Sequence, residues 1–171
     1  MHLNENNSDY RVPFGDVEVY FSTHTASPIY VPDDFATIQD AVDAAYLNDT
    51  IIVRDGTYIE NVDVYKCLTI RSENGSDATI VRAEEPYSVF YVHADYVNIS
   101  GFSVEGEASI LSGGIYLNAE YCNISNNKCR NNTNGIFIRS HFGDSDNNCI
   151  SNNKCTNNVL ANIFLAGSNN K

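Results

Sequence analysis

The most constraining feature of this chain is a repeated segment. Residues 121–132 read Tyr-Cys-Asn-Ile-Ser-Asn-Asn-Lys-Cys-Arg-Asn-Asn, and residues 147–158 repeat this pattern almost residue for residue. A looser copy lies at residues 96–104. The central isoleucines of the copies are separated by 25 and 26 residues: Ile99, Ile124 and Ile150. Short apolar segments at such a period, separated by Asn and Gly turns, predict a solenoid in which each repeat packs on the next.

From residue 50 onward the chain reads as short strands with turns between them. Apolar and polar residues alternate in triplets such as Val-Asn-Ile, which places the apolar side chains inside and the polar ones outside. Pairs of asparagines recur at Asn126-Asn127 and Asn152-Asn153. Asn tolerates the left-handed backbone of tight corners, and stacked amides can bond to one another from coil to coil. We therefore expect asparagine ladders at the corners.

A second series of segments aligns through its aromatic residues. The alignment predicts that four rings point outward on one face of the solenoid: Phe90, Tyr116, Phe137 and Phe164. Aromatic rings can stack on sugars, on neighbouring coils or on a partner surface. These four residues are the candidate ligand-binding residues.

One helix precedes the strands, at about residues 37–47. Thr37 starts a segment that resembles a capping box, and an apolar stripe follows at helical spacing. The stripe consists of Ile38, Ala41, Val42, Ala45 and Tyr46. Such a helix would cover the open end of the first coil. We expect a leader or linker at 1–28, with a possible edge strand at Val17–Phe21, and one β-helix domain at 29–171 with coils at about 50–171.

The composition of the chain disfavours several classes of binding partner. The 171-residue chain has a formal net charge of -12, which disfavours nucleic acid and anionic membranes because both need clustered Lys and Arg. An acidic polysaccharide would need a local basic patch or a bridging cation such as calcium. No apolar run approaches the roughly 18 residues of a membrane span, and the polar residues 1–9 do not read as a signal peptide.

The five cysteines follow the repeat and include no Cys-x-x-Cys pair, which argues against zinc. We expect them to be buried core residues. Cys129 and Cys155 share a repeat position and should lie side by side, facing inward. A disulfide between them is the alternative.

Two stretches resemble known proteins. The segments Ile29–Ala45, Asp49–Asn61 and Leu68–Ile70 look like the N-terminal cap and first coil of right-handed parallel β-helix proteins of the pectin-lyase-like superfamily. Residues 96–165 resemble the Asn-rich coils of NosD-type repeats, which occur in archaeal cell-surface proteins. The resemblance implies an all-β, right-handed parallel β-helix with an N-terminal capping α-helix, and an extracellular or cell-surface location. The NosD name also implies copper delivery, but His93 and His141 are isolated and Met1 is the single Met.

Lyases of this superfamily combine acidic calcium ligands with a basic residue on one outward face. The candidates for such a catalytic group lie at the end of one strand and in the loop after it: Arg139, His141, Asp144 and Asp146. Asp144 and Asp146 could share a calcium ion, although Asp-Ser-Asp is also ordinary turn chemistry. The acidic residues of the early coils fit a solvated face: Asp55, Glu60, Asp63 and Asp95.

The sequence favours a non-catalytic cell-surface or interaction module that binds carbohydrate or a protein surface, with no cofactor other than calcium. The alternatives are a carbohydrate-active enzyme of the lyase, hydrolase or epimerase type, and the N-terminal part of a longer β-helix surface protein. The final strand, Ile163–Leu165, predicts self-association through the C-terminal coil because an exposed strand edge invites pairing.

Overall fold

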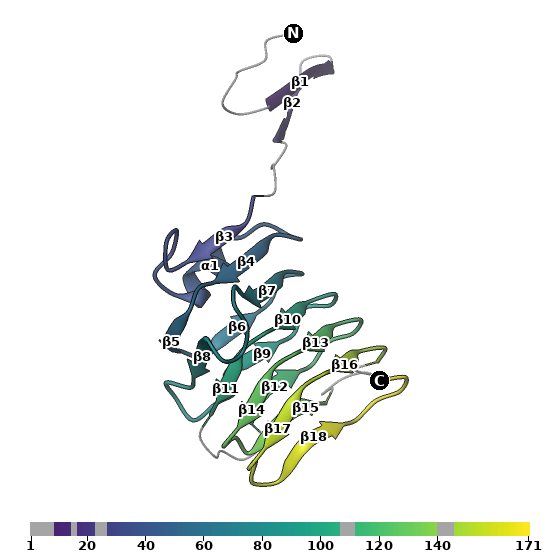
Figure 1. Ribbon diagram of the computed structural model, residues 1–171. Coiled ribbons are helices and arrows are strands. Elements are labelled where there is room, and N and C mark those ends of the chain that lie inside the picture. Colours follow the sequence, from purple (N-terminus) through teal and green to yellow (C-terminus); the bar gives the residue numbers. More distant parts are fainter. Residues whose placement is uncertain (1–8, 15–16, 23–26, 107–111, 140–145) are drawn as a thin grey trace.

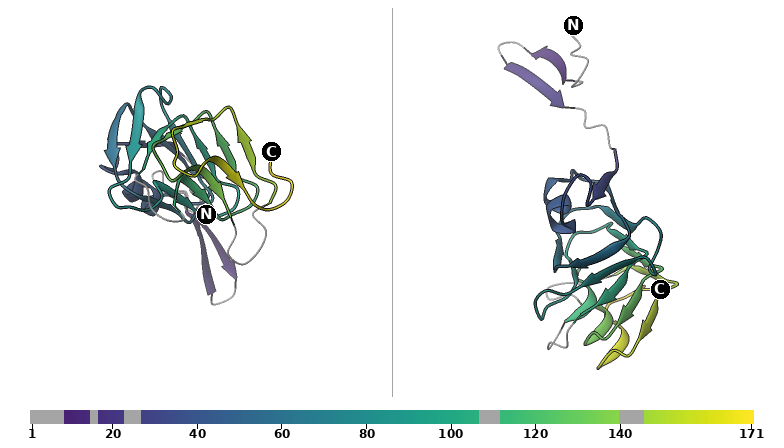
Figure 2. Two further views of the ribbon diagram at one scale, coloured as in Figure 1. Left: turned by 90° about the horizontal axis from the view of Figure 1, so that it is seen from below. Right: turned by 60° about the vertical axis from the view of Figure 1, so that its left-hand side comes forward.

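The computed structural model describes residues 9–14, 17–22, 27–106, 112–139 and 146–171, and side chains from residue 27 onward. The chain winds into about five coils, and the strands of successive coils lie beside one another along the stack (Figure 1). The fold is an all-β parallel β-helix with one short helix, as the repeat predicted. Figure 2 shows from two further directions how the coils stack, with the C-terminus in the last one.

Three parallel sheets form the walls. Sheet I contains β3 (Ile29–Val31), β4 (Thr50–Val53), β7 (Thr69–Ser72), β10 (Asn98–Ser100), β13 (Asn123–Ser125) and β16 (Cys149–Ser151). Sheet II contains β5 (Gly56–Ile59), β8 (Thr79–Arg82), β11 (Ser103–Glu105), β14 (Lys128–Arg130) and β17 (Lys154–Thr156). Sheet III contains β6 (Val62–Val64), β9 (Phe90–Val92), β12 (Gly113–Leu117), β15 (Asn134–Ile138) and β18 (Ala161–Leu165). A separate antiparallel pair is formed by β1 (Asp9–Phe14) and β2 (Val17–Ser22).

The core is a stack of identical positions. Ile99 pairs with Ile70 on one side and with Ile124 on the other, and Ile124 pairs in turn with Ile150. Ile70, Ile99 and Ile124 are fully buried. Because inward residues recur every second position of each strand, the column of isoleucines read from the sequence becomes one continuous ridge of the core.

The two asparagines of each pair have different structural roles at the corners. The first member of each pair takes the left-handed conformation, with φ between 55° and 59°: Asn126, Asn131, Asn152 and Asn157. The second member forms the hydrogen bonds that link one coil to the next. The backbone N–H and the Nδ2 of Asn127 both donate to Oδ1 of Asn153, at 2.9 and 3.2 Å, and Asn153 Nδ2 donates to the carbonyl of Ile124 at 2.7 Å. Buried backbone groups at the corners are thus paired, as buried polar groups must be.

The helix α1 (Ile38–Ala44) closes the first coil. Thr37 is its N-cap, and its hydroxyl accepts a hydrogen bond from the Asp40 N–H at 3.0 Å. Ile38 and Val42 are fully buried against the coil. The helix is shorter than expected because the chain turns extended at Ala45. The prediction that Tyr46 belongs to the buried stripe is therefore wrong, and its side chain is 63% exposed.

Two charged side chains of the first coil hold the ends of this helix. Both carboxylate oxygens of Glu60 accept N–H groups at the helix start, from Ile38 at 3.0 Å and Gln39 at 2.9 Å. At the other end, the Lys66 ammonium donates to three carbonyl oxygens. A negative group at the N-terminus and a positive group at the C-terminus both complement the helix dipole. Glu60 is buried, so the prediction that it lies on a solvated face is wrong.

The cysteines differ in burial: Cys122 and Cys129 are buried, Cys67 and Cys155 are half-buried, and Cys149 is exposed. Cys129 and Cys155 are partners in the register of β14 and β17, with Cys129 fully buried, which confirms that they lie side by side facing the core. Both thiols are free, so the disulfide alternative is not formed. The prediction of burial is wrong for Cys149, which is exposed because it pairs with the outward Asn123.

Candidate functional site

The outer face of sheet III carries the predicted aromatic row. Inward residues such as Val64, Val92 and Leu117 alternate with outward ones, so each strand presents to the outside the side chain that lies between its last two inward residues. Those side chains form a continuous row across the coils: Asp63, Tyr91, Tyr116, Phe137 and Phe164. We call the four rings among them, Tyr91 to Phe164, the aromatic ladder.

Phe90 does not belong to the aromatic ladder, contrary to the prediction. It pairs with the inward Ile115, is fully buried and packs against Phe102, with 5.4 Å between the ring centroids. Tyr91 occupies the outward position instead. The sequence places two aromatic residues side by side here, so an alignment by aromatic character alone is ambiguous by one residue, and one residue decides which face a side chain takes.

The rings of the aromatic ladder stack on one another. Neighbouring centroids are 5.3 Å apart for Tyr91 and Tyr116, 5.1 Å for Tyr116 and Phe137, and 5.0 Å for Phe137 and Phe164. Tyr116 is 8% exposed and Phe137 is 4% exposed, whereas Phe164 is 43% exposed. The inner rings therefore stabilise the coil stack, and Phe164 is the ladder ring with the largest exposed fraction.

Burial also changes the acidity of Tyr116. Loss of solvent raises the pKa of its hydroxyl, and the neighbouring Tyr91 adds to the effect, while the positive charge of Arg139 opposes it. A tyrosine is protonated at neutral pH even with its ordinary pKa near 10, and the raised pKa of Tyr116 makes ionisation still less favourable. It can take part in hydrogen bonding, but it is unsuited to abstract a proton.

Polar side chains follow the strands of sheet III directly beside the aromatic ladder. They are Tyr65, His93, Asn118 and Arg139, each one residue beyond the last paired inward residue of its strand. The His93 ring stacks on Tyr91 at 5.1 Å, and its Nε2 lies 2.8 Å from the Asp63 carboxylate. Arg139 is exposed. This polar row, together with the aromatic ladder, forms the candidate site.

The predicted catalytic loop is only partly within the described residues. His141 and Asp144 lie outside them. The Asp146 carboxylate accepts the backbone N–H of Ser168, and the Asp146 carbonyl accepts the N–H of Tyr121 at 3.2 Å. These bonds give Asp146 a structural role between coils. Within the described residues no group of three or more His, Cys, Asp or Glu side chains could hold a metal ion, so the calcium site remains a prediction.

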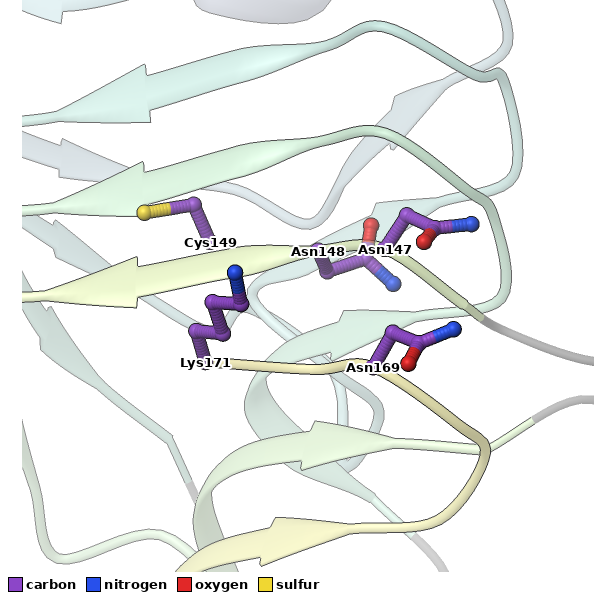
Figure 3. Close-up of a pocket in the computed structure, with 5 residues that line it drawn as sticks. All are labelled: Asn147, Asn148, Cys149, Asn169 and Lys171. Carbon is purple, nitrogen blue, oxygen red and sulfur yellow. The ribbon is translucent and has the colours of Figure 1, made fainter.

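Pockets lined by described residues also lie away from sheet III. One of about 450 Å³ lies at the edge of sheet I and is lined by Asn147, Asn148, Cys149, Asn169 and Lys171 (Figure 3). Its buried member, Asn148, is already bonded to the neighbouring coils as part of a corner ladder. A smaller pocket, on sheet II, is lined by Lys128, Arg130, Lys154 and Thr156. This basic pocket is not evident from the sequence because its residues come from two different coils.

The three stacked parallel sheets and the outer face of sheet III define this protein as a parallel β-helix that carries an aromatic ladder on its outside. A cell surface glycoprotein of Methanothermus fervidus is 36% identical to this chain over 100 residues, which are 57% of the chain and 16% of the relative. The chain thus spans about a sixth of that relative's length.

Among solved structures, an alginate lyase from Paenibacillus is similar, with a TM-score of 0.50 over 74% of this chain and 57% of the lyase. Their sequences are 18% identical, so the likeness concerns the fold alone. No family model matches the chain, and the NosD-type assignment of its coils remains a prediction.

Among the described residues, no helix has the length and apolar character that crossing a membrane requires.

Proposed function

We propose that this chain is a non-catalytic module of a cell-surface protein and that it binds carbohydrate on the outer face of sheet III. The cell-surface part of the proposal is supported by the archaeal relative, whose name describes a cell surface glycoprotein. The carbohydrate part goes further and rests on the geometry of the candidate site. A fold shared with a lyase does not by itself carry a function, because function resides in sites grafted on folds.

The observation that carries the proposal is the combination of the aromatic ladder with the polar row beside it. Phe164 exposes part of its ring, while Arg139 and His93 present exposed hydrogen-bonding groups on the same face. Binding sites for small ligands commonly combine apolar surface with a few polar groups that fix orientation. A sugar has the same two-sided chemistry, with C–H groups on its ring faces and hydroxyls around its edge.

A glycan array probed with and without calcium tests this proposal. We expect wild-type protein to retain at least one glycan, and Phe164→Ala and Arg139→Gln each to weaken that binding about fivefold or more. Tyr96→Ala is the matched control, because Tyr96 is an exposed tyrosine that stacks on Tyr121, outside the aromatic ladder. Binding that survives both site variants, or no retained glycan at all, would contradict the proposal.

A second candidate function is a carbohydrate-active enzyme of the lyase or epimerase type. It is favoured by the ionisable side chains that successive coils place on sheet III: Asp63, His93, Tyr116 and Arg139. The raised pKa of Tyr116 leaves His93 as the more suitable base. Ultraviolet absorbance of an unsaturated product, formed from uronate polymers by wild type and not by His93→Ala, would establish this alternative. Absence of product under conditions where glycan binding is measured supports the binding module.

We also propose that the 171-residue chain self-associates through the coil that contains β18. In the described structure β18 pairs with β15 alone, and Ile163 and Leu165 are 42% and 47% exposed. Exposed strand edges with apolar side chains pair readily with another chain. Light scattering at high concentration should give a mass above 19.0 kDa, and Ile163→Lys should lower it. A single-chain mass for wild type would refute this association.

A further inference from the structure

Basic side chains gather on the outer face of sheet II. Four of the ten Lys and Arg residues of the chain project from its neighbouring strands: Arg82, Lys128, Arg130 and Lys154. They form two columns. Lys128 lies opposite Lys154, and Arg82 and Arg130 flank Glu105. In a chain with a net charge of -12, this is an unusual local concentration of positive charge.

The carboxylates on this face neutralise only part of that charge. The Glu105 carboxylate accepts a hydrogen bond from the Nε of Arg82 and another from the Nε of Arg130, each at 2.9 Å. Burial alone would raise the pKa of Glu105, but the hydrogen bonds and charges of the two arginines outweigh it, and the pKa is lowered. Asp77 pairs with Lys128. A hydrogen bond from Lys128 chiefly lowers the pKa of Asp77, and the more distant charge of Lys154 contributes.

Of the four basic side chains on sheet II, Lys154 is the one without an ion-pair partner among the described residues. Its side chain is exposed. It lies directly opposite Lys128 on the neighbouring parallel strand, where strands are about 4.8 Å apart. Like charges in opposing positions destabilise a sheet. Asp77 pairs with Lys128 and relieves part of that repulsion, and an anion bound beside Lys154 would relieve the rest.

The space for such an anion is present. A pocket of about 190 Å³ is lined by Lys128, Arg130, Lys154 and Thr156. Three of these side chains carry positive charge, and the Thr156 hydroxyl can donate a hydrogen bond. Pockets for whole drug-sized ligands are larger, about 300–1,000 Å³. This pocket therefore suits a single anionic substituent of a larger molecule.

We propose that this pocket binds a carboxylate or sulfate group of an acidic polysaccharide. A polymer is favoured over a free ion because single exposed ion pairs are weak, whereas repeated anionic groups can rebind the same pocket. The net charge of -12 disfavours polyanions over the chain as a whole, so a face with four basic side chains is the favoured place for them. The pocket lies on a different sheet from the aromatic ladder, and the inference is independent of the sugar site proposed there.

The test measures binding of the full chain to immobilised polygalacturonate, dextran sulfate and neutral dextran. We expect binding to one or both polyanions, none to dextran, and a decline as salt is raised from 20 to 300 mM, because exposed charges are screened. Polygalacturonate and dextran sulfate separate the two sources of negative charge. Lys154→Gln should weaken binding about 2- to 5-fold, as expected for the loss of an exposed ion pair.

Two control variants locate the effect. Lys171→Gln removes the same charge from an exposed position beside sheet I and should leave polyanion affinity within about twofold. Arg139→Gln tests sheet III separately, so a failure of the glycan proposal there leaves this result unaffected. Unchanged melting temperatures would show that each variant folds.

Three results would overturn the inference. The first is that neither polyanion binds in 20 mM salt. The second is that Lys154→Gln binds as wild type does while Arg139→Gln loses binding, which would move the polyanion site to sheet III. The third is a low-salt dimer that Lys154→Gln abolishes without any polysaccharide binding, which would make the acidic surface of a second copy the occupant.

Discussion

Replacing Lys66 with Met tests how the first coil is closed. The Lys66 ammonium lies 3.1 Å from the Val42 carbonyl oxygen, 2.8 Å from that of Asp43 and 2.9 Å from that of Ala45. Methionine keeps the length of the side chain but removes the charge and all three hydrogen bonds. The change therefore isolates the contribution of the ammonium group to the helix end.

The magnitude follows from the contacts. Hydrogen bonds to a charged group contribute about 1.5–3 kcal/mol when buried, and a cation at a helix C-terminus contributes about 0.3–1 kcal/mol. Lys66 is only half-buried, and its three bonds share one charge, so their contributions do not add. We expect a loss of about 2 kcal/mol. For a chain of this length, that lowers the melting temperature by about 4–8 °C.

The assay is urea and thermal unfolding of Lys66→Met beside Lys171→Met. The control makes the same substitution at an exposed lysine beside sheet I whose side chain contacts no helix carbonyl. Hydrogen exchange should show faster exchange of the α1 amides in Lys66→Met and no change in Lys171→Met. If the two variants unfold at the same urea concentration, the bonds from the Lys66 ammonium to the end of α1 do not stabilise the cap, and the predicted loss of stability is wrong.

Three further predictions concern the cap and the core. Val42→Asp places a charge where the side chain is fully buried, and should lower the unfolding free energy by several kcal/mol in denaturant titrations; wild-type stability would refute the capping role. Burial raises the pKa of Glu60 above its ordinary value near 4.5 by more than the two N–H groups of the helix start lower it, so the folded state favours the neutral carboxyl; the pH-dependent part of its contribution is complete below that pH and declines as pH rises through the folded-state pKa. The advantage of wild type over Glu60→Gln in urea unfolding should thus be greater at pH 4 than at pH 7, and the opposite order would contradict it. A water-soluble thiol reagent should modify Cys149 quickly and Cys129 slowly in the native state, because the first is exposed and the second fully buried; equal rates would show the inward assignment of Cys129 to be wrong.

Several features of this protein follow from its sequence alone. The repeat forces equivalent residues into equivalent places, so the isoleucine column, the asparagine corners and the pairing of Cys129 with Cys155 could be predicted before any coordinates. The cap could also be predicted, because Thr37 and the apolar spacing after it are local signals. Local or periodic information is sufficient in each of these cases.

Other features depended on the tertiary structure. Val89-Phe90-Tyr91-Val92 fits either face equally well as a pattern, and only the register with β12 sends Phe90 inward and Tyr91 outward. Glu60 resembles an ordinary surface acid until the helix start is placed above it. These outcomes rest on contacts between segments that the sequence does not relate to one another.

The basic pocket shows the same limit most clearly. Lys128 and its partner Asp77 are 51 positions apart, and Lys154 joins them from yet another coil. The net charge of the chain indicates an acidic protein but does not show where the basic residues lie, because composition carries no information on position. The winding of the chain brings distant basic residues onto one face of sheet II, and that placement is what creates a site for an anion.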